Sequence, residues 1–309
     1  MGMKILKWSL GALFVAALSF VLSAARCDIP VQTLKERYAK QSSRFLAMQG
    51  MNVHYADEGK GFPLVLVHGT AASLHTWDAW AEALTPHFRV IRMDLPAFGL
   101  TGPNESHDYS TRMYVDFMRE FLDKTGVARC HMAGNSLGGA VAWNFAAYYP
   151  ARVDRLVLID AGGFPRTDDP PLPFRIARTP VINLVARWLT PRFVIRKSLL
   201  EVYGDDSKVT DDLVDRYYDM ALREGNRAAF IARSARPDAP DTSLLKTIRA
   251  PVLIMWGAED RWIPVENASR FKREIPGSRA IVYKGAGHVP MEEIPRETAA
   301  DALNFLAGQ

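Results

Sequence analysis

A serine flanked by glycines carries the strongest chemical signal in this sequence of 309 residues. It lies in the run Gly134-Asn135-Ser136-Leu137-Gly138, which fits the pattern G-x-S-x-G. A strand-like run, Cys130–Ala133, precedes it, and a helical stretch rich in small residues follows it. A sharp turn between strand and helix holds a serine hydroxyl at the tip of a sheet, and Gly134 and Gly138 allow close packing there. We therefore predict that Ser136 is a nucleophile.

His288 is the predicted general base, which a serine nucleophile needs because its hydroxyl is weakly reactive. The residue lies in Gly285-Ala286-Gly287-His288-Val289-Pro290, directly after the last strand-like run. Glycines at this place make a loop that can carry the imidazole over the edge of a sheet. A histidine with a pKa of about 6.5 takes up and returns a proton around neutral pH.

The base in turn needs a carboxylate that fixes its orientation, and three residues are candidates. Asp260 ranks first, because it follows a buried strand at the place where catalytic groups collect in open α/β sheets. Asp160, which ends another buried strand, ranks second, and Glu259 ranks last. The chain order Ser136, Asp260, His288 is the one expected when a strand-turn-helix element carries the serine.

Backbone N–H groups at two places are predicted to stabilise an oxyanion. Leu137 follows the serine and opens a helix, so its N–H lacks a partner within that helix. The second donor is expected in the loop His68-Gly69-Thr70, after the first buried strand, with Thr70 as the donor residue. His68 is interpreted as a residue that shapes this loop and takes no direct part in catalysis.

A parallel sheet would bring these residues together, and the sequence has the pattern of one. Short apolar runs alternate with helical stretches, which indicates an α/β fold with a mostly parallel central sheet covered by helices on both faces. One antiparallel strand is expected at Met48–Ala56. The parallel strands are expected at Leu64–Val67, Arg89–Met93, Cys130–Ala133, Leu156–Ile159, Val252–Met255 and Ala280–Tyr283. Helices are expected at Leu74–Leu84, Thr111–Thr125, Leu137–Tyr149 and Val265–Ile275.

The alternation stops between residues 163 and 248, where no strand pattern is evident. Prolines begin this segment, and predicted helices follow at Val181–Leu189, Arg192–Val202 and Thr210–Glu224. We interpret 163–248 as a helical cap inserted between core segments 48–162 and 249–309. Its first half mixes apolar side chains with arginines. This mixture indicates either a helix packed over the active site or contact with an anionic membrane surface.

Residues 1–27 are predicted to be a signal peptide or a transmembrane anchor. Two lysines precede an uncharged apolar stretch, Trp8–Ala25, which is nearly long enough to span the hydrocarbon core. Ser23 and Ala25 also suit cleavage by a signal peptidase, so both interpretations stay open. Either one places the folded part in a membrane-anchored, secreted or periplasmic location. Residues 28–47 are expected to form a connector with some helical character at Thr33–Lys40.

The composition excludes several other classes of protein. Apolar residues make up 48% and charged residues 23%, which argues against a disordered chain or a polytopic membrane protein. The formal net charge of +4 comes from interspersed residues, so nucleic-acid binding is not expected. Two cysteines, Cys27 and Cys130, make no disulfide framework, and no Cys or His spacing indicates a metal site.

From about Met48 to its end, the sequence resembles the α/β-hydrolase fold superfamily. The resemblance rests on His68-Gly69-Thr70, Asp94-Leu95-Pro96-Ala97-Phe98-Gly99, the turn around Ser136, Trp256-Gly257-Ala258-Glu259-Asp260 and Gly287-His288. It implies the triad and the oxyanion donors named above, a cap at 163–248 and no cofactor. Serine at the turn argues against the branches of this family that use aspartate there.

The residues and the resemblance together predict a serine hydrolase of carboxylic esters, with a small, lipophilic ester as substrate. Ser136 would attack the carbonyl, and His288 would move the proton in each step. A hydrolase of activated carbon–carbon bonds with the same machinery is the alternative, and a non-catalytic binding protein of this fold is a third possibility. Asn144, on the helix after the serine, is interpreted as a packing residue.

Overall fold

The computed structural model describes residues 26–166, 168–235 and 241–308, so the predicted leader or anchor lies almost wholly outside the described residues. The strands are β1 (Ser43–Met48), β2 (Met51–Glu58), β3 (Pro63–Val67), β4 (Arg89–Met93), β5 (Cys130–Asn135), β6 (Val153–Ile159), β7 (Val252–Gly257) and β8 (Arg279–Tyr283). The core helices are α2 (Val31–Tyr38), α3 (Asp78–Leu84), α4 (Thr111–Lys124), α5 (Leu137–Tyr148), α11 (Glu266–Glu274), α12 (Pro290–Glu293) and α13 (Pro295–Leu306). Within the described ranges, none of the helices combines the length and hydropathy that crossing a membrane requires.

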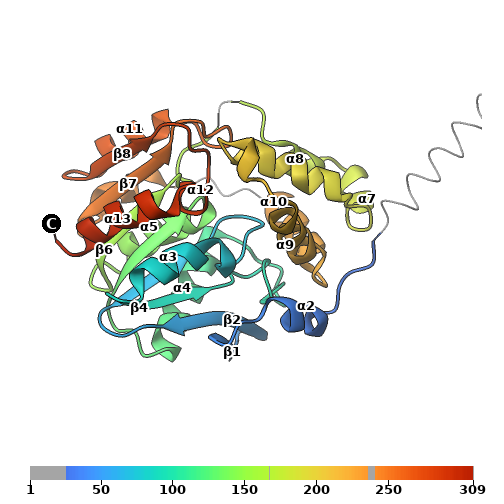
Figure 1. The fold of residues 1–309 in the computed structure, drawn as a ribbon, viewed down its shortest axis with the longest axis horizontal. Helices are drawn as coiled ribbons and strands as arrows, with labels where there is room; N and C mark the ends of the chain where they lie inside the picture. Colours follow the sequence, from blue (N-terminus) through green and yellow to red (C-terminus); the bar gives the residue numbers. More distant parts are fainter. Residues whose placement is uncertain (1–25, 167, 236–240, 309) are drawn as a thin grey trace, which may run out of the picture.

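All eight strands form one sheet in the order β1-β2-β4-β3-β5-β6-β7-β8 (Figure 1). β2 pairs antiparallel with β1 and β4, and all other pairs are parallel. The predicted α/β class and the six predicted parallel strands are therefore confirmed. The order reverses at β3, because β4 lies on one side of it and β5 on the other. Loops that follow β3 and β5 thus border one crevice, where open α/β sheets bind their ligands.

Two apolar layers enclose the sheet, and β3 shows why its sequence is a continuous apolar run. Val65 and Val67 belong to the core cluster that includes α4 and α5, whereas Leu64 and Leu66 belong to the cluster with α3 and α13. Successive side chains of a strand point to opposite faces, so a strand covered on both faces needs apolar residues throughout.

The expected connector at 28–47 is wrong, because this segment is folded onto the rest of the chain. It contains α2 and β1, and Leu34 of α2 is completely buried. Asp28 forms an ion pair with Arg227, far along the sequence. Both elements are short, so they left only a weak pattern in the sequence.

The start of the sheet also differs from the single strand expected at Met48–Ala56. The chain forms a hairpin there, and β1 and β2 pair across a turn at Gln49 and Gly50. Both turn residues have positive φ, 50° and 71°, which suits a two-residue turn whose twist matches antiparallel strands. The alternation of side chains continues through so short a turn, so the sequence pattern shows no break.

A helical insertion covers the carboxyl ends of the strands, as predicted (Figure 1). Its helices are α6 (Leu172–Arg178), α7 (Ile182–Ala186), α8 (Arg192–Val202), α9 (Asp211–Leu222) and α10 (Asn226–Ala235). The short 3₁₀ helix at Thr242–Thr247 packs on α5 and α11, and its Leu245 is fully buried in the core cluster. The core therefore resumes slightly before residue 249, the boundary expected from the sequence.

Candidate active site

Ser136 lies at a strained turn between β5 and α5. Its φ of 55° and ψ of −116° are unusual for a residue with a side chain, and such strain persists only where neighbours enforce it. Its N–H donates to the carbonyl of Ile159 at 3.0 Å, and its carbonyl accepts from the N–H of Gly162 at 2.9 Å. The backbone of β6 and the loop after it thus hold the nucleophile in place.

The glycines around Ser136 are required by close backbone packing. A Cβ atom at Gly138 would lie 2.0 Å from the carbonyl oxygen of Val67, and one at Gly134 would lie 2.3 Å from that of Gly138. A Cβ at Gly69 would lie 2.9 Å from the side-chain oxygen of Asn135. Helix α5 can therefore approach β3 and β5 only because these positions lack side chains.

His288 and Asp260 form a buried hydrogen-bonded pair beside the serine. Nδ1 of His288 donates to Oδ2 of Asp260 at 2.7 Å. The other oxygen, Oδ1, accepts from the backbone N–H groups of Trp262 at 2.7 Å and Ile263 at 2.9 Å. Ser136 and His288 line the same two cavities. The structure thus brings the three predicted triad residues together, with Nε2 left for the serine.

Of the two other carboxylates considered, Asp160 is also close to the histidine. Polar atoms of Asp160, Asp260 and His288 all lie within 4.8 Å of one another, while Glu259 is exposed. Oδ1 of Asp160 accepts from the N–H of Gly257 at 2.9 Å. Burial and the adjacent Asp260 raise the pKa of Asp160 well above its ordinary value, which favours its protonated form. A protonated carboxyl cannot stabilise an imidazolium, so Asp260 suits that role better.

Two supporting residues were not anticipated from the sequence. Nδ2 of Asn135 donates to the carbonyl of His288 at 2.9 Å, which ties the loop of the base to the turn of the nucleophile. Glu293 is buried, and its carboxylate accepts from the N–H groups of Gly287 at 2.7 Å and Asp205 at 2.8 Å. Asn135 lies inside the G-x-S-x-G run, but nothing in a single sequence distinguishes its role.

The loop after β3 places Thr70 beside the serine. Nδ1 of His68 donates to the carbonyl of Gly69 at 2.7 Å, and its Nε2 accepts from the N–H of Leu95 at 2.9 Å. Burial lowers the pKa of His68, so the ring is neutral and holds two loops together. Thr70 and Ser136 border both cavities, and Leu137 is the first residue of α5. Their role as oxyanion donors stays a prediction.

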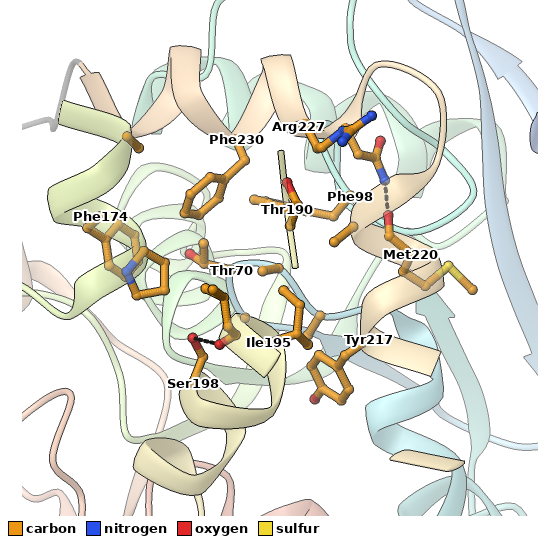
Figure 2. Close-up of a pocket in the computed structure, with 18 of the residues that line it drawn as sticks. Thr70, Phe98, Phe174, Thr190, Ile195, Ser198, Tyr217, Met220, Arg227 and Phe230 are labelled. Atoms are coloured by element: carbon orange, nitrogen blue, oxygen red, sulfur yellow. Dashed lines mark hydrogen bonds between the residues drawn. The ribbon is translucent and has the colours of Figure 1, made fainter. Parts of the chain in front are cut away.

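The first cavity, of about 220 Å³, is lined mainly by apolar side chains of the cap (Figure 2). Phe174, Phe230 and Ile195 surround it, and Thr70 lies between them in the close-up. Arg227 also lines it, and its guanidinium pairs with Asp28 at 2.6 Å. This cavity therefore offers an apolar ligand a dry surface that reaches Ser136.

The second cavity, of about 580 Å³, is more polar and also reaches Ser136. Four arginines line it together with Asp168 and Glu266; they are Arg166, Arg178, Arg233 and Arg270. Among the described residues, Arg166 alone of these four is in an ion pair, with Asp168. Asn144 also lines the cavity, but its Nδ2 donates to the carbonyl of Ala140 in the same helix at 2.9 Å.

Comparison with known proteins defines the family. Residues 63–295 match the sequence profile of the alpha/beta hydrolase fold, so the chain belongs to this family and is a hydrolase of that fold. A 2-hydroxy-6-oxo-2,4-heptadienoate hydrolase of Pseudomonas putida is 30% identical, over 86% of this chain and 96% of the relative. A crystal structure of a meta-cleavage product hydrolase of Pseudomonas fluorescens is 27% identical, with a TM-score of 0.74, over 85% of this chain and 97% of that one.

A membrane phospholipase A structure is also 27% identical, with a TM-score of 0.75. The match covers 99% of this chain and 96% of the phospholipase chain. Similar proteins therefore include both carbon–carbon bond hydrolases and an ester hydrolase. The named sequence relative favours the carbon–carbon alternative over the carboxylic ester that was predicted first.

Proposed function

We propose that this protein hydrolyses carboxylic esters whose acyl group is lipophilic. The observation that carries the proposal is the apolar first cavity, whose one arginine is already neutralised by Asp28. An apolar acyl chain gains free energy on burial there, whereas a charged group would lose its hydration and meet only Arg227, whose charge Asp28 already balances. Likeness to a phospholipase over 99% of the chain supports the same substrate class.

The geometry accounts for each step of ester hydrolysis. Ser136 attacks the carbonyl carbon while Nε2 of His288 takes the proton of its hydroxyl, and Asp260 keeps the imidazole oriented and stabilises its cationic form. N–H groups of Thr70 and Leu137 would bind the oxyanion. His288 then protonates the departing alcohol, and a water molecule releases the acyl group by the same sequence of transfers.

A carbon–carbon bond hydrolase is the second candidate, and two observations favour it. Named relatives carry that activity in their names, and the second cavity holds arginines that can bind a carboxylate through two parallel hydrogen bonds. A dienone acid could place its carboxylate there and its reacting ketone at Ser136. The apolar cavity would then hold the other end of the substrate.

A direct competition between substrates tests the proposal. We would measure kcat/KM of the full chain for p-nitrophenyl esters of increasing acyl length and for a 2-hydroxy-6-oxo-2,4-dienoate. We expect long-chain esters to be preferred, and Ser136→Ala to lower the rate by about 10⁴-fold or more. Ile195→Trp, which fills the first cavity, should shift the optimum to shorter chains.

Arg178→Gln serves as the matched variant in the second cavity, because Arg178 is exposed and its Nε contacts the carbonyl of Ser234. It should leave ester hydrolysis nearly unchanged. Dienoate cleavage faster than that of any ester, and sensitive to Arg178→Gln, would replace the ester proposal by the carbon–carbon one. If the protein cleaves neither substrate class, both proposed functions are rejected.

A further inference from the structure

The outer surface of the cap carries a concentrated apolar patch. Among the described residues, nine large apolar side chains are exposed, and six of them lie between residues 181 and 193. We call them the cap patch; they are Val181, Ile182, Leu184, Val185, Trp188 and Phe193. Trp188 is 67% exposed and Phe193 60%. Single exposed apolar residues are common, but a contiguous group of this kind marks a contact surface.

The cap patch is the outer side of a thin cover over the apolar cavity. None of the residues of α7 is buried, and this helix lies at the outer end of the cap in Figure 1. Ala186, Leu189 and Val194, from the same stretch of chain, line the first cavity on its inner side. The cap here is therefore one helix thick, with apolar side chains on both sides.

The segment of chain that carries the cap patch is basic, although Arg192 and Arg196 in it pair with Asp211 and Asp215 of α9. Residues 171–200 contain six basic side chains and no acidic one. Arg187 and Lys197 are both exposed and take part in none of the ion pairs among the described residues. Lys197 follows Phe193 by four positions in α8, so the two share one face of the helix. A surface with apolar and basic residues together suits an anionic bilayer, whereas two copies of it would repel each other.

The chain reaches the cap patch directly from the apolar N-terminal stretch. The N–H of Arg26 donates to the carbonyl of Trp188 at 3.2 Å. Two residues later, the ion pair between Asp28 and Arg227 fixes the chain to α10. The uncharged stretch Trp8–Ala25, which lies outside the described residues, therefore joins the folded part at the cap patch.

From the exposed apolar side chains, the basic residues beside them and the contact with Arg26, we propose that the cap patch docks on an anionic lipid bilayer. Trp188 and Phe193 lie at the level of the acyl chains near the interface, and Arg187 and Lys197 contact lipid phosphates. This docking does not depend on which bond the enzyme cleaves, because it involves only the outer side of the cap.

Fluorescence quenching in vesicles tests this orientation. The full chain would carry Ser136→Ala, which keeps the lipids intact, in vesicles of equal parts phosphatidylcholine and phosphatidylglycerol with or without brominated acyl chains. Subtraction of the signal of Trp188→Phe isolates Trp188 from the other tryptophans. We expect brominated lipid to remove most of the Trp188 fluorescence. Val282→Trp, at an exposed position on the distant strand β8, is the matched control and should stay unquenched.

Charge reversal tests the basic part of the proposal. Arg187→Glu with Lys197→Glu should weaken the quenching of Trp188 by about tenfold or more, because each cation near an anionic surface contributes about a fivefold factor. Lys272→Glu with Arg273→Glu, two exposed positions on α11, should leave the quenching unchanged. Equal Trp188 fluorescence with and without bromine, or equal quenching of Val282→Trp, would overturn the docking. An emission of Trp188 that depends on protein concentration but not on bromine would assign the patch to a second copy instead.

Discussion

The edge of the sheet that carries Ser136, Asp260 and His288, here called the core edge, is packed much more tightly than the cap that covers it. At the core edge, buried backbone groups hold each reacting residue, and glycines remove every side chain that would prevent close packing. In the cap, short helices leave much of their surface exposed, and α7 buries none of its residues. Bond cleavage needs atoms held in place to a fraction of an ångström, whereas a substrate-binding cover tolerates adjustment.

The two regions nevertheless meet at a few specific contacts. The N–H of His288 donates to the carbonyl of Val202, at the end of α8, at 2.7 Å. Glu292, four residues after the base, pairs with Arg216 of α9 and accepts from Tyr217 at 2.8 Å. The cap therefore touches the loop that carries the base, so that a change in the cap can reach the chemistry.

The largest effect is expected when a side chain is added at the core edge. Gly138→Ala would place a Cβ atom 2.0 Å from the carbonyl oxygen of Val67, which a strand in the centre of the sheet cannot avoid. We expect a loss of at least about 3 kcal/mol in the free energy of unfolding, with loss of activity. Gly162→Ala is the control, because its Cβ would meet no atom closer than 3.4 Å, and it should cost less than about 1 kcal/mol. Urea unfolding measures both, and equal values for the two variants would contradict this explanation of the turn.

A smaller effect is expected when the link between cap and core is cut. Glu292→Gln leaves the guanidinium of Arg216 partly buried without its charge partner, which should cost about 2 kcal/mol. Asp215→Asn removes an ion pair with Arg192 that is exposed to solvent, and should leave Tm nearly unchanged. Thermal unfolding compares the variants, and Glu292→Gln should also raise KM more than it lowers kcat.

The double variant Glu292→Gln with Arg216→Met sharpens this test. It removes the unpaired charge as well, so part of the lost stability should return. If the double variant is no more stable than Glu292→Gln alone, the cost does not come from the unpaired charge.

The smallest effect on activity is expected at Asp160. Because the raised pKa of Asp160 favours its protonated form, Asn is a close match, and Asp160→Asn should change kcat/KM only a few-fold. Asp260→Asn, by contrast, should lower kcat by about 10⁴-fold, because the histidine loses the partner of its Nδ1. A large loss in Asp160→Asn would show that Asp160 acts as the carboxylate of the triad.

The pH dependence of stability gives a second measurement on the same variant. The pKa of Asp160 is higher in the folded than in the unfolded state, so its folded form keeps a proton that the unfolded form releases above about pH 3.9. The contribution of Asp160 to the free energy of unfolding of the wild type therefore decreases as the pH rises above about 3.9. Asp160→Asn should raise Tm at pH 8 and change it little at pH 4, and an equal change at both values would contradict the raised pKa.

Local patterns explain what could be predicted from the sequence. Each central strand is a run of apolar residues bounded by turn residues, so the six parallel strands were found without knowing their neighbours. The turn around Ser136 is equally local, because its glycines stand within a few residues of the serine. The edge strand β1, in which Met48 alone is buried, lacks such a pattern and was missed. Glu293 was also missed, because its partners lie on other segments.

What the sequence by itself determined is therefore the fold class, together with the candidates for nucleophile and base, since short-range apolar periodicity and turn chemistry encode them. Only the tertiary structure distinguishes Asp260 from Asp160, because both follow neighbouring strands and only the packing shows that Asp260 accepts from Nδ1 of His288. It alone also revealed two cavities of different polarity at one serine, and the contact between Arg26 and Trp188. Such features join residues far apart in the chain, and no local pattern records which distant side chains will meet.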